Sequence, residues 1–246
     1  MKTPVIIIGW GNAARFFAHK ITNAVTFEIE AIASRSIIDC KPFAHISIEE
    51  IPANFKGIVL VCVSDDAIEA VAAKITCTNA TIAHCAGSVS LAVLHPFEHA
   101  AVFYPLQTLA NKAEENFPVL IECQQKETES ILFSLAAACH LTPALMSSAD
   151  RLKLHLAAVM TNNFTNHLLA SIKQYLQTHQ LDAQLLMPLL TKTVSILGTH
   201  ENGFDQQTGP AKRKDTSTIE KHLRMLAEDK ALQQLYAFFS KAIGER

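Results

Sequence analysis

An apolar run that ends in two closely spaced glycines is the feature that most constrains the fold of this chain. Val5 to Ile8 is continuously β-branched, as in a strand buried on both faces of a sheet. The residues from Gly9 to Ala14 follow at once and match the pattern G-x-G-x-x-A. In that pattern the first glycine permits a tight turn, and the last position is small enough for a helix to pack against the strand. We therefore expect the chain to begin with a strand, a tight turn and a helix.

The same alternation of β-rich runs and helical patterns continues to residue 149. Asp65 and Asp66 are placed to cap the second expected helix. Strands that alternate with helices form βαβ units, so the pattern predicts an α/β domain with a parallel sheet. The expected strands are residues 5–8, 26–33, 57–63, 80–84, 101–104 and 119–122, and the expected helices are residues 12–23, 65–75 and 126–139.

The pattern changes after residue 149, because no convincing strand follows. Pro188 either kinks a helix or starts a new one, and Asp215 or Ser217 can cap the last helical region. The prediction is an α/β domain over residues 1–149 followed by an all-helical domain over residues 150–246. Within it the expected helices are residues 150–177, 182–197 and a final stretch to about residue 243 with a break over 228–230, and residues 198–214 are a polar loop.

Composition excludes several classes of protein. Hydrophobic residues make up 49% of the 246 residues and charged residues 18%, so the chain can bury a substantial core. A formal net charge of -2, with one short basic cluster at Lys212 to Lys214, disfavours nucleic acid as a partner. No apolar stretch approaches the roughly 20 residues of a membrane span. The six cysteines form no C-x-x-C pair, so we expect a reduced cytoplasmic protein without membrane contact or structural metal.

The glycine turn also predicts a ligand. Without a Cβ at the second glycine, the backbone can approach a diphosphate closely, and the N–H groups at the start of the helix can bind it. We interpret the turn as the dinucleotide-binding turn of a Rossmann domain. The alternative is an ordinary glycine-rich turn between a strand and a helix. The residues expected to contact the cofactor here are Gly9, Trp10, Gly11, Asn12 and Ala13.

The end of the second strand indicates which dinucleotide is bound. NAD-specific domains place an acidic residue there to bind the ribose hydroxyls. This chain instead has Ser34 and Arg35, and a guanidinium suits the 2′-phosphate of NADP. We therefore predict NADP(H), with NAD(H) as the alternative cofactor and a merely exposed Arg35 as the alternative interpretation. Ser64 and Asp65 follow the third strand at the same sheet edge and are expected beside the cofactor, although helix capping alone would explain the aspartate.

Several stretches of the chain resemble a known group of proteins. That group consists of Rossmann-like proteins with a C-terminal domain of unknown function, related to pyrroline-5-carboxylate reductase, deazaflavin-dependent NADP oxidoreductases and 6-phosphogluconate dehydrogenase. The resemblance implies a cofactor cleft between the two domains, a C-terminal domain like that of 6-phosphogluconate dehydrogenase, and a homodimer formed through it. The stretches are Ile8 to Asn12, His84 to Ser88, Tyr104 to Thr108 and Thr208 to Asp215, with a weaker one at His155 to Ala158, Asn163 and Phe164.

The resemblance also implies roles for individual residues. It puts His84, Gly87 and Ser88 near the nicotinamide, although His84 can also be a hydrogen-bonded core histidine. It puts His155 and Asn163 on the substrate side. Those two residues are spaced by a multiple of four along the long helix, which predicts one shared face with Val159 and His167. The alternative is that Asn163 and His167 are surface or interface groups.

One departure from the related β-hydroxyacid dehydrogenases bears on the reaction. Their catalytic lysine lies four residues before such an asparagine, where this chain has Val159. This favours reduction of a C=N or small carbonyl group, with His155 as the proton donor, over oxidation of a hydroxyacid by a lysine base. Arg213, in a cationic loop before a helix, is the candidate for binding an anionic substrate.

The sequence therefore predicts an NADP(H)-dependent oxidoreductase that transfers hydride to a small anionic imine or carbonyl compound. The competing hypothesis is a non-catalytic dinucleotide sensor or scaffold on the same fold, because a fold alone does not establish activity.

Overall fold

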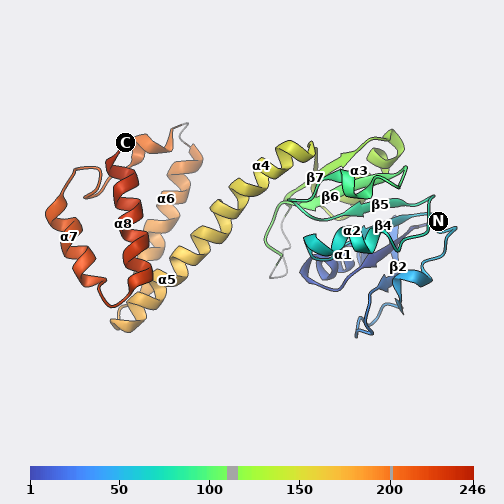
Figure 1. The fold of residues 1–246 in the computed structure, drawn as a ribbon, viewed down its shortest axis with the longest axis horizontal. Coiled ribbons are helices and arrows are strands. Elements are labelled where there is room, and N and C mark those ends of the chain that lie inside the picture. Colours follow the sequence, from blue (N-terminus) through green and yellow to red (C-terminus); the bar gives the residue numbers. More distant parts are fainter. Residues whose placement is uncertain (110–115, 200–201) are drawn as a thin grey trace. The chain divides into compact units, whose positions relative to one another are not determined.

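The computed structural model describes residues 1–109, 116–199 and 202–246. The chain divides by its contacts into two compact units, Met1–Asn162 and Asn163–Arg246. The helical stretch that begins at Ser148 continues through this division, whereas the boundary predicted from the sequence lies near its start. The two units are described separately below (Figure 1).

The first unit is built on one sheet of eight strands in the order β3-β2-β1-β4-β5-β6-β7-β8. This confirms the predicted α/β class and Rossmann-like fold. The sheet is parallel except at one place, because β7 pairs antiparallel with β6 and β8 then follows parallel to β7. The strands are β1 (Thr3–Ile8), β2 (Phe27–Ala33), β3 (His45–Ile46), β4 (Ile58–Val61), β5 (Thr81–His84), β6 (Ala100–Pro105), β7 (Pro118–Cys123) and β8 (Thr142–Leu145).

Two of these strands, β3 and β8, lie at the edges of the sheet and were not predicted. β3 has only two residues, and β8 contains Pro143, which has no N–H to give to a strand ladder. Edge strands of this kind lack the continuous apolar pattern of strands buried on both faces. Their pairing depends on neighbours distant in sequence, which a local pattern does not record.

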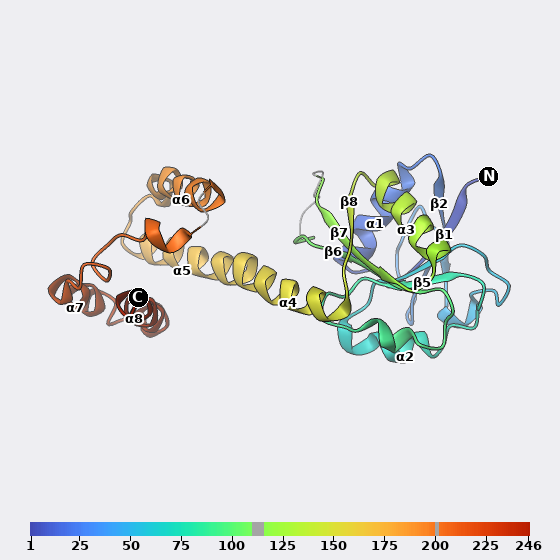
Figure 2. The ribbon, with the colours of Figure 1, turned by 90° about the horizontal axis from the view of Figure 1, so that it is seen from above.

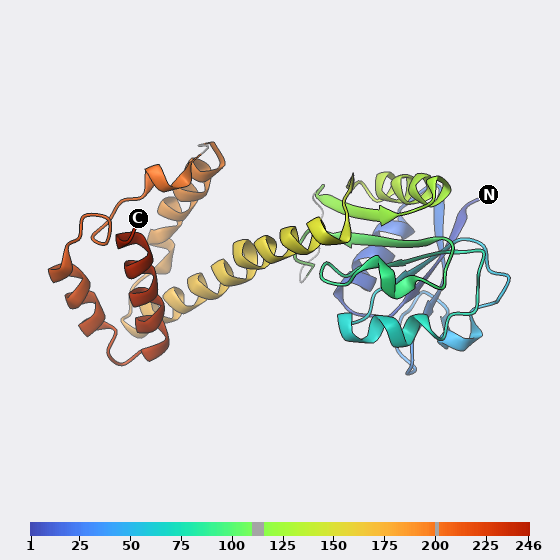
Figure 3. The ribbon, with the colours of Figure 1, turned by 45° about the horizontal axis from the view of Figure 1, so that its top comes forward.

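Helices cover both faces of the sheet (Figures 2 and 3). α1 (Asn12–Thr22) and α3 (Lys126–Ala138) pack on one face, and α2 (Ile68–Ala72) packs on the other. Successive residues of β1 serve the two layers alternately, because Val5 and Ile7 join the first cluster while Ile6 and Ile8 join the second. The continuous β-branched run thus has the two-sided burial that the sequence predicts.

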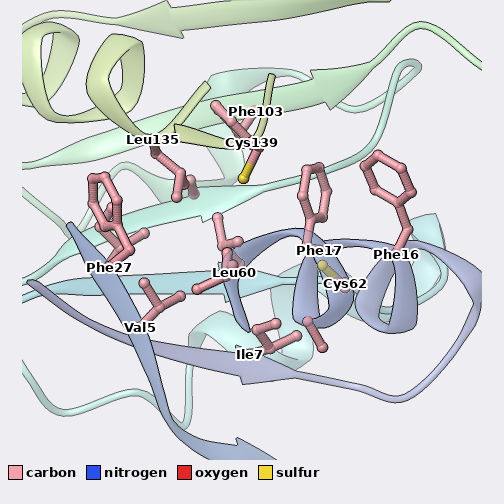
Figure 4. Packing of buried hydrophobic residues seen from close by; sticks show 14 of the residues in the cluster. Val5, Ile7, Phe16, Phe17, Phe27, Leu60, Cys62, Phe103, Leu135 and Cys139 are labelled. Atoms are coloured by element: carbon pink, nitrogen blue, oxygen red, sulfur yellow. The ribbon is translucent and has the colours of Figure 1, made fainter. Parts of the chain in front are cut away.

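The core under α1 and α3 is closed and tightly packed (Figure 4). Phe17 and Phe103 are both fully buried, with ring centroids 5.4 Å apart. Leu60 from β4 and Leu135 from α3 are also fully buried in this cluster. Burial of each such side chain contributes about 1.5–3 kcal/mol, so this layer fixes the frame from which the carboxyl ends of the strands project.

The capping role predicted for Asp65 and Asp66 is wrong. The helical segment opens with a 3₁₀ turn over Asp65–Ala67, and Ser64 occupies the N-cap position. Asp65 instead accepts a hydrogen bond from the Ser88 hydroxyl, across to the loop after β5. Its carboxylate is therefore used to join two loops at the sheet edge.

The second unit is helical. The helical stretch entering it comprises α4 (Ser148–Ala158), a π-helical segment (Val159–Phe164) and α5 (Thr165–Thr178), and it is followed by α6 (Met187–Thr199), α7 (Thr216–Met225) and α8 (Lys230–Gly244). Pro188 is the second residue of α6, so it starts a new helix. Asp215 caps α7 by accepting a hydrogen bond from the Thr218 backbone N–H at 3.0 Å.

The π-helical segment changes the helix face predicted from four-residue spacing. An α-helix aligns residues about four apart, but a π-helix bonds i to i+5 and shifts the register. Because this segment begins at Val159 and includes Asn163, the predicted continuous face from His155 to His167 is interrupted. The spacing alone therefore does not bring His155 and Asn163 onto one stripe.

No helix in the described ranges combines the length and the apolar character needed to cross a membrane.

Candidate functional site

The glycine turn after β1 has the geometry that a dinucleotide turn requires. Gly9 has a φ of +103°, and a Cβ there would lie 2.4 Å from the Cys62 carbonyl oxygen. Gly11 is the N-cap of α1, and a Cβ there would meet nothing within 4 Å. No side chain caps this helix start. The N–H groups of the first turn of α1 therefore lack a side-chain cap, and an anion that approaches the uncrowded Gly11 can accept their hydrogen bonds.

The other predicted residues of the turn have different surroundings. Asn12 is exposed in the first turn of α1, and Ala13 is half-buried against the core. Trp10 packs edge-on against Phe43, with ring centroids 6.1 Å apart, and the Arg15 guanidinium lies over the indole at 5.8 Å. The Trp10 ring is thus held by protein contacts beside the turn.

A pocket of about 250 Å³ opens next to Gly9 at the carboxyl ends of β1, β2 and β4. The polar lining of the pocket comes from two loops. Ser34, Arg35 and Ser36 follow β2, and Ser64 follows β4. The remaining lining is apolar: Ile8, Ile38, Ile48, Val63, Ala67 and Val71. A pocket with a largely apolar lining and a guanidinium suits a nucleoside that carries an anionic group on its ribose.

A chain of contacts links this turn to the loop after β5. The Sγ atoms of Cys62 and Cys85 lie 3.4 Å apart, directly beyond the β4–β5 pair. The hydrogen bond with Cys62, together with burial, raises the pKa of the Cys85 thiol well above its usual value. Because the Cys85 thiol stays protonated, it packs as a small apolar group against Cys62 at the sheet edge. The hydrogen bond from Ser88 to Asp65 joins the same two loops further out.

The loop after β5 ends against a pair of side chains that contact each other. The Tyr104 hydroxyl and His155 Nδ1 are 3.0 Å apart. A Cβ on Gly87 would lie 2.5 Å from His155 Nδ1 and 2.7 Å from Tyr104 Cζ. Only a residue without a side chain fits at position 87 while the Tyr104–His155 pair is in place. Three of the stretches that carry the family resemblance therefore meet at one point.

The electrostatic surroundings keep Tyr104 protonated at neutral pH. Burial raises the pKa of its hydroxyl, the negative charge of Asp65 adds to the effect, and Arg151 opposes it. Tyr104 was absent from the predicted site residues. Its position at the end of β6, a parallel strand, is the sequence signal that could have found it, because ligands bind beyond the carboxyl ends of such strands.

His84 lies in the protein core, away from solvent. The imidazole is fully buried, and its Nδ1 accepts a hydrogen bond from the Ala86 backbone N–H at 3.3 Å. Burial lowers the pKa of His84 to about 4, with a further contribution from the positive charge of Arg151. His84 is therefore neutral at physiological pH, and its Nε2 has no hydrogen-bond partner among the described residues.

A buried ion pair anchors α4 to the sheet one helical turn before His155. Arg151 is only 1% exposed and pairs with Glu122 of β7, while its Nη2 donates to the Val89 carbonyl at 2.5 Å. Burial acts to raise the pKa of Glu122, but hydrogen bonds from Ser148 and Arg151 outweigh it and lower that pKa. His155 follows Arg151 by one helical turn, so the ion pair positions the histidine. The pair leaves no local signal in the sequence, because its two residues are 29 positions apart.

The remaining two predicted site residues lie in the second unit. Asn163 is exposed within the π-helical segment. Arg213 is exposed in the turn before α7, close enough to Asp215 for its charge to contribute to the lowered pKa of that carboxyl. Among the described residues, no group of three or more potential metal ligands is present.

The decisive comparison covers the last two strands of the sheet and the helices that follow. Residues 117–243 match the model of a family described as a domain of unknown function, DUF2520. This chain belongs to the DUF2520 family. Membership confirms the resemblance to Rossmann-like proteins with a C-terminal domain of unknown function. Comparison with the curated proteins finds no match.

Solved structures similar to this DUF2520 protein cover almost its whole length. A Bacteroides fragilis protein described as a candidate NADP oxidoreductase is 31% identical, with a TM-score of 0.84, over 100% of this chain and 99% of that one. A Thermotoga maritima protein is 22% identical, with a TM-score of 0.69, over 98% and 97% of the two chains. Pyrroline carboxylate reductase of Plasmodium falciparum, solved with NADP bound, is 13% identical with a TM-score of 0.63, over 98% of each chain. The last two likenesses are of fold.

Proposed function

We propose that this DUF2520 protein is an NADP(H)-dependent oxidoreductase that reduces the C=N or C=O bond of a small anionic substrate. The similarity to the Bacteroides fragilis protein supports the enzyme class and the cofactor. The open turn at Gly9 and Gly11, and the pocket lined by Arg35, supply the contacts that a dinucleotide phosphate needs. NADP(H) would lie along the sheet edge from Gly11 past Ser64 and Asp65 to Gly87 and Ser88.

The observation that carries the proposal is the contact between Tyr104 and His155, which lie directly against Gly87. Bound NADPH would supply a hydride to the substrate carbon. The protein must then deliver a proton to the substrate nitrogen or oxygen, so that C=N or C=O gains two hydrogens in all. We assign this role to His155, because its imidazole contacts Tyr104 at the loop after β5 and imidazole is the side chain that most often serves as a general acid. Burial keeps His84 neutral, and the raised pKa of Tyr104 keeps its hydroxyl protonated.

The Tyr104 hydroxyl can serve His155 in both protonation states. When Nε2 gives up its proton the imidazole keeps its proton on Nδ1, so Nδ1–H would donate to the Tyr104 hydroxyl both before and after the transfer. This contact holds the ring while Nε2 gives its proton to the reduced substrate. Gly87 leaves the space in which both rings approach one another. In this assignment His155 is the acid, and Tyr104 is the residue that orients it.

Asn163 and Arg213 remain proposed substrate-side residues. Arg213 is exposed and carries a guanidinium suited to a carboxylate on the substrate. Replacement of Arg213 by Gln should raise KM for an anionic substrate while leaving the Kd of NADPH unchanged. An equal effect on a neutral substrate would contradict this assignment.

We also propose that the second unit forms a homodimer. Its helices expose large apolar side chains, including Leu185 at 76%, Leu189 at 65% and Phe238 at 66%. A pocket of about 430 Å³ among α5, α7 and α8 is lined mainly by apolar groups. Large exposed apolar side chains are typical of association sites when they form a patch. Sedimentation velocity should give a dimer that dissociates in Leu189→Glu, and a monomeric wild type would contradict the proposal.

Cofactor binding is tested by titrating the full chain with NADPH and NADH and following nucleotide fluorescence. The wild type should bind NADPH more tightly. Gly11→Ala should fold normally, since its Cβ meets no neighbour, yet weaken NADPH at least tenfold by blocking the approach of the diphosphate. Gly198→Ala is a matched control, because a Cβ there also meets nothing within 4 Å. Equal affinity for both nucleotides would contradict the NADP assignment.

Turnover is tested with a panel of imines, keto acids and aldehydes, measured as NADPH oxidation. His155→Ala should lower kcat about 100-fold and Tyr104→Phe about tenfold, with KM and the Kd of NADPH changing little. His19→Ala, an exposed histidine on α1, is the matched control. Tight NADPH binding without turnover of any compound would favour the competing function, a dinucleotide sensor or scaffold.

A further inference from the structure

The edge strand β3 brings a histidine against the loop that ends β2. His45 pairs in register with Ile32, and its Nε2 lies 2.9 Å from the Ser34 Oγ. The backbone N–H of Ser34 also donates to the Ile46 carbonyl at 3.2 Å. Both the main chain and the side chain of Ser34 are therefore held by β3, immediately before Arg35.

The two hydrogen bonds of the Ser34 hydroxyl determine which atom donates and which accepts. The Ser34 hydroxyl donates its one proton to the Ser36 carbonyl at 2.6 Å. The same oxygen is then free only to accept, so the hydrogen bond with His45 runs from Nε2–H to Ser34 Oγ. This relay closes the short loop from Ser34 to Ser36 and leaves Arg35 at its apex, where it lines the pocket beside Gly9.

The carboxylate of Glu50 does not replace Ser34 as the hydrogen-bond partner of His45 Nε2–H. Glu50 is a carboxylate that interacts electrostatically with His45, and it accepts a hydrogen bond from the Ser47 backbone N–H at 2.6 Å. That hydrogen bond lowers the pKa of Glu50 and holds its carboxylate on the 3₁₀ turn after β3. The hydrogen bond of His45 Nε2–H is therefore made with the Ser34 hydroxyl.

We infer that His45 is a positioning residue for cofactor discrimination, which acts through Ser34 to hold Arg35 ready for the phosphomonoester of NADP(H). This inference rests on the proposed function. NADH lacks this phosphomonoester and makes no demand on the loop. His45 should therefore affect the affinity for NADPH and leave the affinity for NADH unchanged.

The test is a titration of the full chain with NADPH and NADH for matched variants. His45→Leu should weaken NADPH about tenfold, the scale of one lost hydrogen bond to a charged site, and change the Kd of NADH less than about twofold. His45→Gln carries an N–H close to the position of Nε2 and should restore NADPH binding to within about threefold of wild type. Ser34→Ala should match His45→Leu, and the double variant should be no weaker than either, since both act on one contact.

The outcomes separate this inference from the proposed function. Equal weakening of NADPH and NADH in His45→Leu would show that β3 only supports the fold, and would overturn the inference. Unchanged NADPH binding in both His45→Leu and Ser34→Ala would overturn it too. Failure of the wild type to bind either nucleotide would instead overturn the proposed function. Circular dichroism and the urea midpoint of each variant show whether it is folded, and Ser34→Ala is the milder change if His45→Leu is not.

Discussion

The two units of this chain bury their apolar side chains to very different extents. In the first unit, residues from β1, β4, β5 and β6 are fully buried between helical layers on both faces of the sheet. In the described part of the second unit, the most buried hydrophobic residues are Ala211, Leu226 and Leu232, each 8% exposed. A sheet between two helical layers encloses its own core, whereas these helices leave apolar faces that need another layer. The first unit therefore encloses its own core, and the second unit is the part of the chain for which we propose association.

The largest expected effect of this difference is on core truncation. Phe103→Ala should lower the free energy of unfolding by about 4 kcal/mol, because Phe103 is fully buried against Phe17. Phe238→Ala is the matched change in the second unit and should cost under about 0.5 kcal/mol in dilute protein, because Phe238 is 66% exposed. Urea unfolding followed by circular dichroism measures both. Similar losses would remove the contrast between the units.

Ion pairs in the two units should differ in the same way. Arg151→Met leaves the Glu122 carboxylate without its cation and should lower stability by about 3 kcal/mol. Adding Glu122→Gln should recover part of that loss, because the unpaired charge is then removed. Lys241→Met breaks the exposed pair with Glu245 in α8 and should change stability by under about 0.5 kcal/mol. A loss in Lys241→Met as large as that in Arg151→Met would contradict this interpretation.

The first unit should also carry a dependence on pH that comes from its buried histidine. The pKa of His84 is about 4 in the folded chain and near 6.5 when exposed, so the unfolded state takes up the proton first as pH falls. Stability contributed by neutral His84 is present above the unfolded pKa and is lost as pH falls toward the folded one. From about pH 7 to pH 5 this loss is about 2 kcal/mol. His84→Asn should flatten that slope, and an unchanged slope would assign the dependence to other groups.

The smallest expected effect concerns the second unit alone. If its apolar faces associate, a tenfold increase in protein concentration should stabilise it by about 1.4 kcal/mol of dimer. Leu189→Glu should abolish that dependence, while Phe103→Ala should leave it in place. Differential scanning calorimetry over a series of concentrations measures it. A transition temperature that does not change with protein concentration would contradict this prediction, because it would show that the second unit folds without a partner.

Local patterns predicted the parts of the fold that are determined by near neighbours. The β-branched run before Gly9 gave β1, the glycine pattern gave the turn and α1, and the change after residue 149 gave the helical region. In each case the signal is a backbone requirement or a burial period that lies within one segment. The pocket beside Arg35 follows from the same reasoning, because it forms where parallel strands end.

The features that sequence reasoning missed depend on contacts between distant segments. Tyr104 and His155 are 51 residues apart, and Arg151 and Glu122 are 29 apart. Asp65 looked like a helix cap because its neighbours in sequence allow that role, but the partner it uses is Ser88. The π-helical segment likewise leaves no signal in a four-residue spacing. The identity of such partners becomes visible only when the sheet order brings the strand ends together.

The absence of a side chain at Gly87 has a consequence for how this family can change. A methyl group there would push the imidazole away from the phenol, yet it would leave the phosphate-binding turn untouched. In our proposal, one codon change at this position would thus separate the residue assigned to proton delivery from the residue that orients it.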